Sequence, residues 1–179
     1  MLDLAGIVED SIVDGPGLRC TVFAQGCPHR CPGCHNPETW PFGCGTPMEE
    51  KRVAEIAASN PLCRGVTFSG GEPFAQAEGF AALARALRER GFEVASYSGY
   101  TFEQLLNGTP AQRELLSTID VLIDGPFLLA ERSLELVFRG SRNQRILDVP
   151  ASLAAGQAVP IARGRWLGEY CKAKRSPLR

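Results

Sequence analysis

The sequence predicts a single α/β domain with mostly parallel strands, and three observations support this class. Short apolar segments alternate with amphipathic ones between residues 18 and 148. Such alternation is typical of β/α units joined by right-handed crossovers. The 179 residues suffice for one hydrophobic core, and no internal repeat divides the chain. We therefore expect one domain over residues 1–150, followed by a C-terminal extension, partly disordered, over residues 151–179.

The first predicted strand covers residues 18–24, after a turn with the sequence DGPG at residues 14–17. It leads directly into a cysteine-rich segment. A helix is expected to begin near Thr46, because Thr46 can act as an N-cap, Pro47 suits the first turn and Glu49 follows three residues later.

Two strand–loop–helix units follow. The apolar strand 65–68 ends in SGGEP (residues 69–73), and the next segment has the i, i+3, i+4, i+7 spacing of an amphipathic helix. The strand 92–97 ends in a Ser-Gly turn, and Thr101 with Gln104 predicts a capping box for the helix after it.

The last third of the chain contains one clear strand and two weaker ones. Residues 121–123 are apolar on both faces, as expected when a parallel sheet is covered on both sides. DGPF (residues 124–127) follows this strand. Residues 134–138 and 145–148 are the weaker predictions.

Four loops are expected to meet at one edge of the sheet. The cysteine segment, SGGEP, YSGYT (residues 97–101) and DGPF each follow a predicted strand. Because sites form at the carboxyl ends of parallel strands, this edge is the predicted functional site.

Charge and composition narrow the function further. A net charge of −1 gives no broad surface for nucleic-acid phosphates. No apolar run approaches the roughly 20 residues of a membrane span, and the first ten residues lack the features of a signal peptide. We expect a cytoplasmic protein that binds neither nucleic acid nor membrane. The basic C-terminus, which includes Lys172, Lys174, Arg175 and Arg179, is interpreted as a solvated tail, with docking to an acidic partner as the alternative.

Cys27, Cys31 and Cys34 lie within eight residues. A cysteine cluster in a cytosolic protein more often binds metal than forms disulfides. Structural zinc sites and ferredoxin-type clusters use four ligands, so three thiolates on a [4Fe–4S] cluster leave one iron free for a substrate. Zinc with His29 or His35 as fourth ligand is the alternative. Cys20 is expected in the core, and Cys44, Cys63 and Cys171 are too irregularly spaced for a second cluster.

The spacing Cys27-x3-Cys31-x2-Cys34 resembles the signature of radical S-adenosylmethionine (SAM) enzymes, and GCPHRCPGCHNPETW (residues 26–40) is similar to the activating enzymes of glycyl radical enzymes. With DGPG, SGGEP, SGYT, DGPF and FRGSRNQR (residues 138–145), the set is most similar to the branch that activates anaerobic ribonucleoside-triphosphate reductases. The resemblance covers residues 7–148. Gly33 departs from the aromatic residue that many radical SAM loops carry before the third cysteine.

This resemblance implies a partial (β/α) barrel of the radical SAM type. It implies that Cys27, Cys31 and Cys34 hold one [4Fe–4S] cluster, that SAM chelates the free iron, and that reductive cleavage of SAM leads to a glycyl radical on the catalytic subunit of an anaerobic ribonucleotide reductase. A flavodoxin or ferredoxin is the expected reductant.

The resemblance also implies which residues contact SAM. Gly70 and Gly71 admit a close approach of the backbone, and Glu72 is expected to accept a hydrogen bond from the SAM ammonium. The further predicted cofactor-binding residues are Gly33, Cys34 and His35 beside the adenine, together with Ser98, Asp124 and Arg139.

Three other functions stay open. One is activation of another glycyl radical enzyme, of the formate-lyase type. A second is small-molecule radical SAM chemistry of the 7-carboxy-7-deazaguanine synthase kind. A third is a zinc-binding or electron-transfer module, which leaves SGGEP and SGYT without a role.

Overall fold

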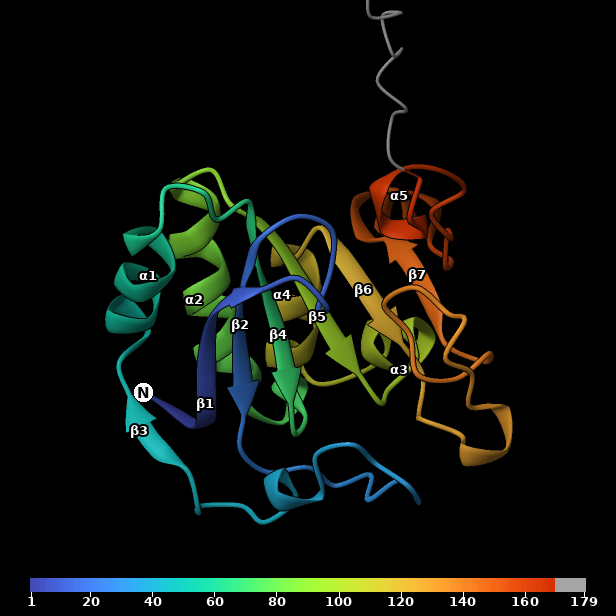
Figure 1. Ribbon diagram of the computed structural model, residues 1–179, viewed down its shortest axis with the longest axis horizontal. Helices are drawn as coiled ribbons and strands as arrows, with labels where there is room; N and C mark the ends of the chain where they lie inside the picture. Colours follow the sequence, from blue (N-terminus) through green and yellow to red (C-terminus); the bar gives the residue numbers. More distant parts are fainter. Residues whose placement is uncertain (170–179) are drawn as a thin grey trace, which may run out of the picture.

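The computed structural model describes residues 1–169, which form one seven-stranded sheet with the order β3-β1-β2-β4-β5-β6-β7 (Figure 1). The four central strands run parallel, and the outer three are antiparallel to their neighbours. The parallel strands are β2 (Arg19–Ala24), β4 (Gly65–Gly70), β5 (Glu93–Ser98) and β6 (Val121–Asp124); the outer strands are β1 (Leu2–Ser11), β3 (Thr46–Met48) and β7 (Arg145–Asp148). The predicted α/β class with mostly parallel strands is confirmed. The sheet is open, because β3 and β7 are its two ends.

The main core lies between the sheet and its helices. Cys20, Val22 and Ala24 alternate along β2 and join one buried cluster with residues of α1, α2 and α4, as the period of two in a strand requires. The helices are α1 (Glu50–Ser59), α2 (Ala77–Glu89), α3 (Phe102–Leu106), α4 (Pro110–Thr118) and α5 (Val149–Ala155). The predicted core position of Cys20 is confirmed, since only 1% of the residue is exposed.

A smaller core covers part of the opposite face. It contains Ala95, Ile123, Ile146 and Trp166, with Tyr97 and Phe138 packed against it. Trp166 is therefore buried on the sheet, although it comes from the segment predicted as an extension. Helix α5 also crosses the predicted boundary at residue 150. Cys171 and the basic residues beyond it lie outside the described part of the chain.

The N-terminal part of the sheet differs from the prediction. Residues 46–48 form β3, which pairs with Leu2–Leu4 of β1, and α1 begins only at Glu50. The predicted helix start near Thr46 is therefore wrong, and β1 was not predicted at all. The reason is long-range pairing, because Leu2 and Leu4 are buried and their strand edge satisfies the backbone of residues 46–48.

The weak strand predictions had different outcomes. Residues 145–148 form β7, but residues 134–138 form turns and bends, and Leu134 is 87% exposed. The predicted capping box is confirmed, with Thr101 and Gln104 bonded reciprocally at the start of α3. Within residues 1–169, no helix has the length and apolar character needed to cross a membrane.

Candidate functional site

The four loops meet at the carboxyl edge of the sheet, as predicted. A cavity of about 130 Å³ is lined by the cysteine segment, SGGEP, the turn after β5 and the loop after β6. The residues that represent these segments are Cys27, Cys31, Cys34, Gly71, Ser98 and Gly125. Loops that are distant in sequence are thus brought together because their strands are parallel neighbours.

The cysteine loop is closed at its base by backbone hydrogen bonds. The Gly26 amide donates to the Thr39 carbonyl at 2.8 Å, and the Cys27 amide donates to the Trp40 carbonyl at 3.1 Å. Cys27 is buried, whereas Cys31 and Cys34 are partly exposed. Burial raises the pKa of the Cys27 thiol, an effect that the backbone amides of His29 and Arg30 partly oppose. All three sulfur-bearing residues border the same cavity.

The local structure explains why a glycine occupies position 33. Its φ is +74°, a left-handed conformation, and a Cβ there would lie 2.9 Å from Cδ1 of Leu129. An aromatic side chain, which many radical SAM loops have at this position, would meet the loop after β6. The glycine therefore allows the loop after β6 to pack directly against the cysteine loop.

The donor set fits a cluster better than a single metal ion. In residues 1–169, no group of three or more His, Cys, Asp or Glu side chains is arranged around one ion. A [4Fe–4S] cluster instead spreads its thiolate ligands over several irons. Three free cysteines around a shared cavity fit that requirement. His29, a candidate fourth zinc ligand, has its Nε2 atom 2.8 Å from Oε2 of Glu72.

Gly70 and Gly71 lie against the backbone of the loop after β2. A Cβ at Gly70 would be 2.7 Å from the Ala24 nitrogen, and one at Gly71 would be 2.4 Å from the Gly26 carbonyl oxygen. The Gly71 amide donates to Ala24 O at 2.8 Å. Both glycines also line the cavity. The two glycines thus allow the SGGEP loop to pack closely on the backbone of the loop after β2. Their predicted contact with SAM stays a prediction.

Glu72 is enclosed by the protein, with none of the residue exposed. Its carboxylate accepts hydrogen bonds from Phe74 N, Ser98 Oγ and Gly99 N at 2.8–3.1 Å. The predicted contact of Glu72 with an ammonium group stays a prediction, and Ser98, another predicted site residue, is bonded to this carboxylate.

Asp124 is also buried at the edge. Its carboxylate accepts a hydrogen bond from the Phe102 amide at 2.7 Å and pairs with Arg145, which reaches Glu103 as well. The hydrogen bonds that Arg145 donates to both carboxylates raise its pKa, and the guanidinium lowers the pKa of Glu103 to about 2. Asp124 thus joins α3 to β7, and its predicted role toward SAM is untested.

Arg139 and His35 line an adjoining cavity of about 340 Å³, together with Val13, Asp14 and Leu136. Arg139 donates from Nη1 to the Gln144 carbonyl at 3.0 Å. Its Nε atom is buried and has no hydrogen-bond partner within residues 1–169. This cavity faces away from the helices, beside the smaller core.

Sequence reasoning missed several residues of the site. Tyr97 lines both cavities and donates from its hydroxyl to Phe138 O at 3.0 Å. Gln144 donates to Gly125 O and accepts from the Gly140 amide, so it joins FRGSRNQR to DGPF. The many polar residues of FRGSRNQR could have indicated Gln144 as a site residue. No pattern in the sequence near Tyr97 indicates that its side chain lines the cavities.

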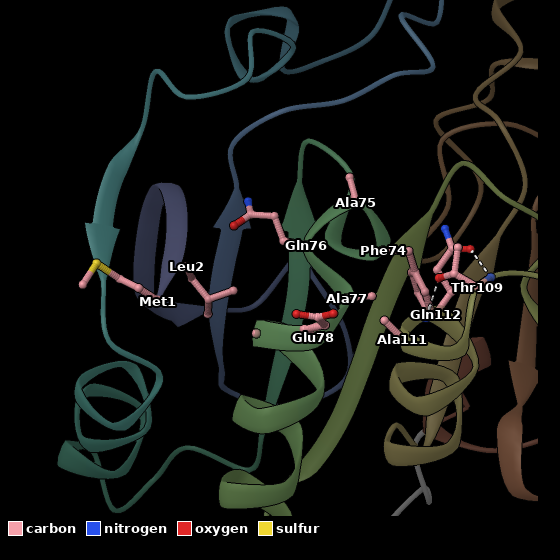
Figure 2. A pocket seen from close by; sticks show the side chains of 11 residues that line it. Met1, Leu2, Phe74, Ala75, Gln76, Ala77, Glu78, Thr109, Ala111 and Gln112 are labelled. Carbon is pink, nitrogen blue, oxygen red and sulfur yellow. Dashed lines mark hydrogen bonds between the residues drawn. The ribbon is translucent and has the colours of Figure 1, made fainter.

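A larger groove, of about 490 Å³, lies elsewhere, between the N-terminal strand and the first turns of α2 and α4 (Figure 2). Gln76 lines it, and its side-chain amide bonds to the backbone of Asp3 and to Gln25 O. Of the predicted site residues, none lines this groove. The groove lies where β1 packs against the turn that follows SGGEP.

Comparisons with known proteins agree with this geometry. Residues 13–147 match the family model described as a 4Fe-4S single cluster domain. The anaerobic ribonucleoside-triphosphate reductase-activating protein of Salmonella typhi is 36% identical over 141 residues, which cover 74% of this chain and 90% of the relative. The proteins of the same name from Vibrio cholerae and Enterobacteria phage T4 are 37% and 34% identical, and the matches cover 75% of this chain and 90% and 86% of those relatives.

A solved structure, QueE from Escherichia coli, superimposes with a TM-score of 0.45 and 18% identity over 56% of this chain and 53% of that chain. A likeness of this size carries no argument about function.

Proposed function

The chain belongs to the family of anaerobic ribonucleoside-triphosphate reductase-activating proteins, and from this premise we propose that it generates a glycyl radical on the catalytic subunit of such a reductase. The observation that carries the proposal is the meeting of three cysteines with SGGEP and the turn after β5 around one cavity.

The cofactors proposed are one [4Fe–4S] cluster and SAM. Cys27, Cys31 and Cys34 would hold three irons, and among residues 1–169 no fourth cysteine lines the cavity. When bound, the cluster and SAM supply the one-electron chemistry that ends in a stored glycyl radical, while the protein supplies binding, orientation and electrostatics.

The chain's own residues shape the space around these cofactors. Gly70, Gly71 and Gly99 bring polar backbone to the wall of the cavity. Phe127 and Trp40 also line the cavity and contribute aromatic, largely apolar surface. This division of polar backbone and apolar walls is typical of sites that orient a small cofactor.

The adjoining cavity is the proposed entry for the reductase segment that carries the glycine. It lies next to the cysteine cavity, since Tyr97 lines both. Val13 on its rim is 72% exposed, and Arg139 is among the residues that line it. The exposed apolar side chains of Ile12 and Val13 beside this cavity suit the docking of a peptide segment from a partner.

Anaerobic reconstitution tests the cofactor proposal. We expect about four irons per chain and cleavage of SAM with dithionite as reductant. Separate Cys27→Ala, Cys31→Ala and Cys34→Ala variants should lose both. Cys44→Ala is the matched control, because Cys44 is exposed and does not line the cavity. Stoichiometric zinc without SAM cleavage would contradict the proposal.

The partner requires a separate experiment. The reduced protein with SAM is mixed with an anaerobic ribonucleotide reductase, and a glycine-centred doublet is expected in the electron paramagnetic resonance (EPR) spectrum. A formate-lyase-type enzyme is the control substrate, and a doublet on that enzyme alone would identify the alternative activase. Replacing dithionite by flavodoxin or ferredoxin tests the proposed reductants. We also propose that the protein acts in the cytoplasm.

A further inference from the structure

One buried carboxylate joins three of the four loops at the edge. Glu72 belongs to SGGEP and accepts hydrogen bonds from Ser98 Oγ at the end of β5 and from Gly99 N directly after it. Its Oε2 atom lies 2.8 Å from Nε2 of His29 in the cysteine loop. With Phe74 N, four donor groups point at this carboxylate. Because an ionised carboxylate offers about four lone-pair positions, its accepting capacity is used within the protein.

His29 lies between Cys27 and Cys31, the part of the cysteine loop that the backbone ties at residues 26 and 27 do not hold directly. Its ring packs edge-on against Tyr100, with the centroids 4.4 Å apart and an interplanar angle of 71°. Only 17% of the imidazole side chain is exposed. The imidazole therefore fills a site built by the turn after β5.

The neighbouring residues fit this placement closely. A Cβ on Gly99 would lie 2.4 Å from Cδ2 of His29, so the glycine of SGYT leaves room for the imidazole. Arg30, the next residue, has a φ of +48°, which is uncommon outside glycine and persists where the surroundings hold it. The loop between the first two cysteines is thus held by side-chain packing at His29.

We propose that His29 is a positioning residue, held by Glu72, Tyr100 and Gly99, that sets Cys27 and Cys31 against the edge where SAM binds. Glu72 then acts through His29 and Ser98 and does not itself bind the SAM ammonium. The inference rests on the proposed function for the identity of the ligand. The placement of the cysteine loop by His29 does not depend on the proposed function, because the contacts of His29 with Glu72, Tyr100 and Gly99 lie within the chain.

The first test uses the metal-free protein. We expect His29→Ala to speed alkylation of Cys31 roughly tenfold, as loss of a hydrogen bond to a charged group predicts. Exposed Cys44 in the same chain is the reference, and its rate should not change. Buried Cys20 and Cys63 report on folding, since they react only if the variant unfolds. Unchanged Cys31 reactivity in a folded variant would overturn the proposal.

The second test uses the reconstituted protein. Mutation of groups that orient metal ligands usually lowers metal affinity or activity 10–100-fold. We therefore expect His29→Ala to weaken SAM binding about tenfold and to change the EPR spectrum of the reduced cluster. His29→Gln retains an N–H donor for Glu72 and should recover most of both properties. If His29→Ala unfolds, the comparison of His29→Gln with His29→Leu decides, and equal SAM affinity and spectra in these two would refute the role.

The proposed function and the positioning role of His29 can be rejected separately. Wild-type protein that holds a cluster but never binds or cleaves SAM would reject the proposed function, whatever His29 does. Wild-type protein that binds SAM, with a folded His29→Ala variant of equal affinity and identical spectrum, would reject only the positioning role.

Discussion

The two edges of the same parallel strands each bury a charge, but they use it differently. At the amino edge, Arg19 opens β2 and has no exposed surface. Its guanidinium donates to Thr67 Oγ1 at 2.7 Å, to Val66 O at 3.0 Å and to Glu93 at 2.7 Å. At the carboxyl edge, Glu72 has none of its surface exposed either, and its partners are the loops around the cysteine cavity.

The partners explain the difference. Arg19 bonds to groups of the adjacent strands, and the Trp166 ring lies 5.1 Å from its guanidinium carbon, so the ion consolidates the sheet and anchors the C-terminal segment. Burial lowers the pKa of Arg19, and the negative charge of Glu93 opposes that effect. Glu72 bonds instead to the last residue of β5, to the turn after it and to His29 of the cysteine loop. A buried charge therefore stabilises the fold at one edge and orients the site at the other.

The largest expected effect is on Arg19. Arg19→Met leaves Thr67 Oγ1 without its guanidinium donor and leaves Glu93 with only Arg165 at 3.5 Å, and we expect the free energy of unfolding to fall by about 3–5 kcal/mol. Urea denaturation measures the change. Exposed Arg52→Met is the control, because Arg52 makes an ion pair with Glu55 at the surface. A loss below about 1 kcal/mol would show that the two edges do not differ as described.

Glu72→Gln comes next. The variant keeps the shape but loses the charge that four donors face, so we expect a stability loss of about 1–3 kcal/mol together with faster alkylation of Cys31 in the metal-free protein. The comparison predicts opposite patterns, in which Arg19→Met affects stability more and Glu72→Gln affects the cysteine loop more. Equal effects of both variants on the cysteine loop would remove the distinction.

Gly99→Ala is expected to have a smaller effect on stability, about 1–2 kcal/mol, because one methyl group must displace the imidazole of His29. The change tests the carboxyl edge without altering any charge. Gly91→Ala is an informative control, since a Cβ there meets nothing within 4 Å although its φ is +83°. Gly99→Ala should alter Cys31 reactivity, and Gly91→Ala should not.

The smallest effect concerns the exposed ion pair at the carboxyl edge. Arg145 lowers the pKa of Glu103 to about 2 from an ordinary value of 4.5. The pair's contribution is fully present above pH 4.5 and is lost as the pH falls toward 2, because the folded state then must take up the proton. We expect less than about 1 kcal/mol, since Glu103 is half exposed. Urea denaturation of Glu103→Gln should show a flatter pH dependence than the wild type, and parallel curves would contradict this.

Much of the parallel sheet could be predicted from local patterns. The strands near 65–68, 92–97 and 121–123 are short segments rich in apolar residues and followed by turn residues, and the Thr101–Gln104 capping box lies within four residues. These patterns depend only on residues that are close in the sequence, and for that reason the structure contains the strands and the capping box that they predict. The helix expected near Thr46 failed for the opposite reason, since Leu2–Leu4 supplied a strand partner more than forty residues away.

The sequence by itself determined the α/β class, the loops that follow the strands, and the close spacing of three cysteines in one of those loops. Only the tertiary structure decided that His29 meets Glu72 across 43 residues of chain and that Trp166 covers Arg19. Spacing and periodicity record contacts between near neighbours along the chain. The partner of a buried charge depends instead on which strands become adjacent, and that is settled by the packing of the whole sheet.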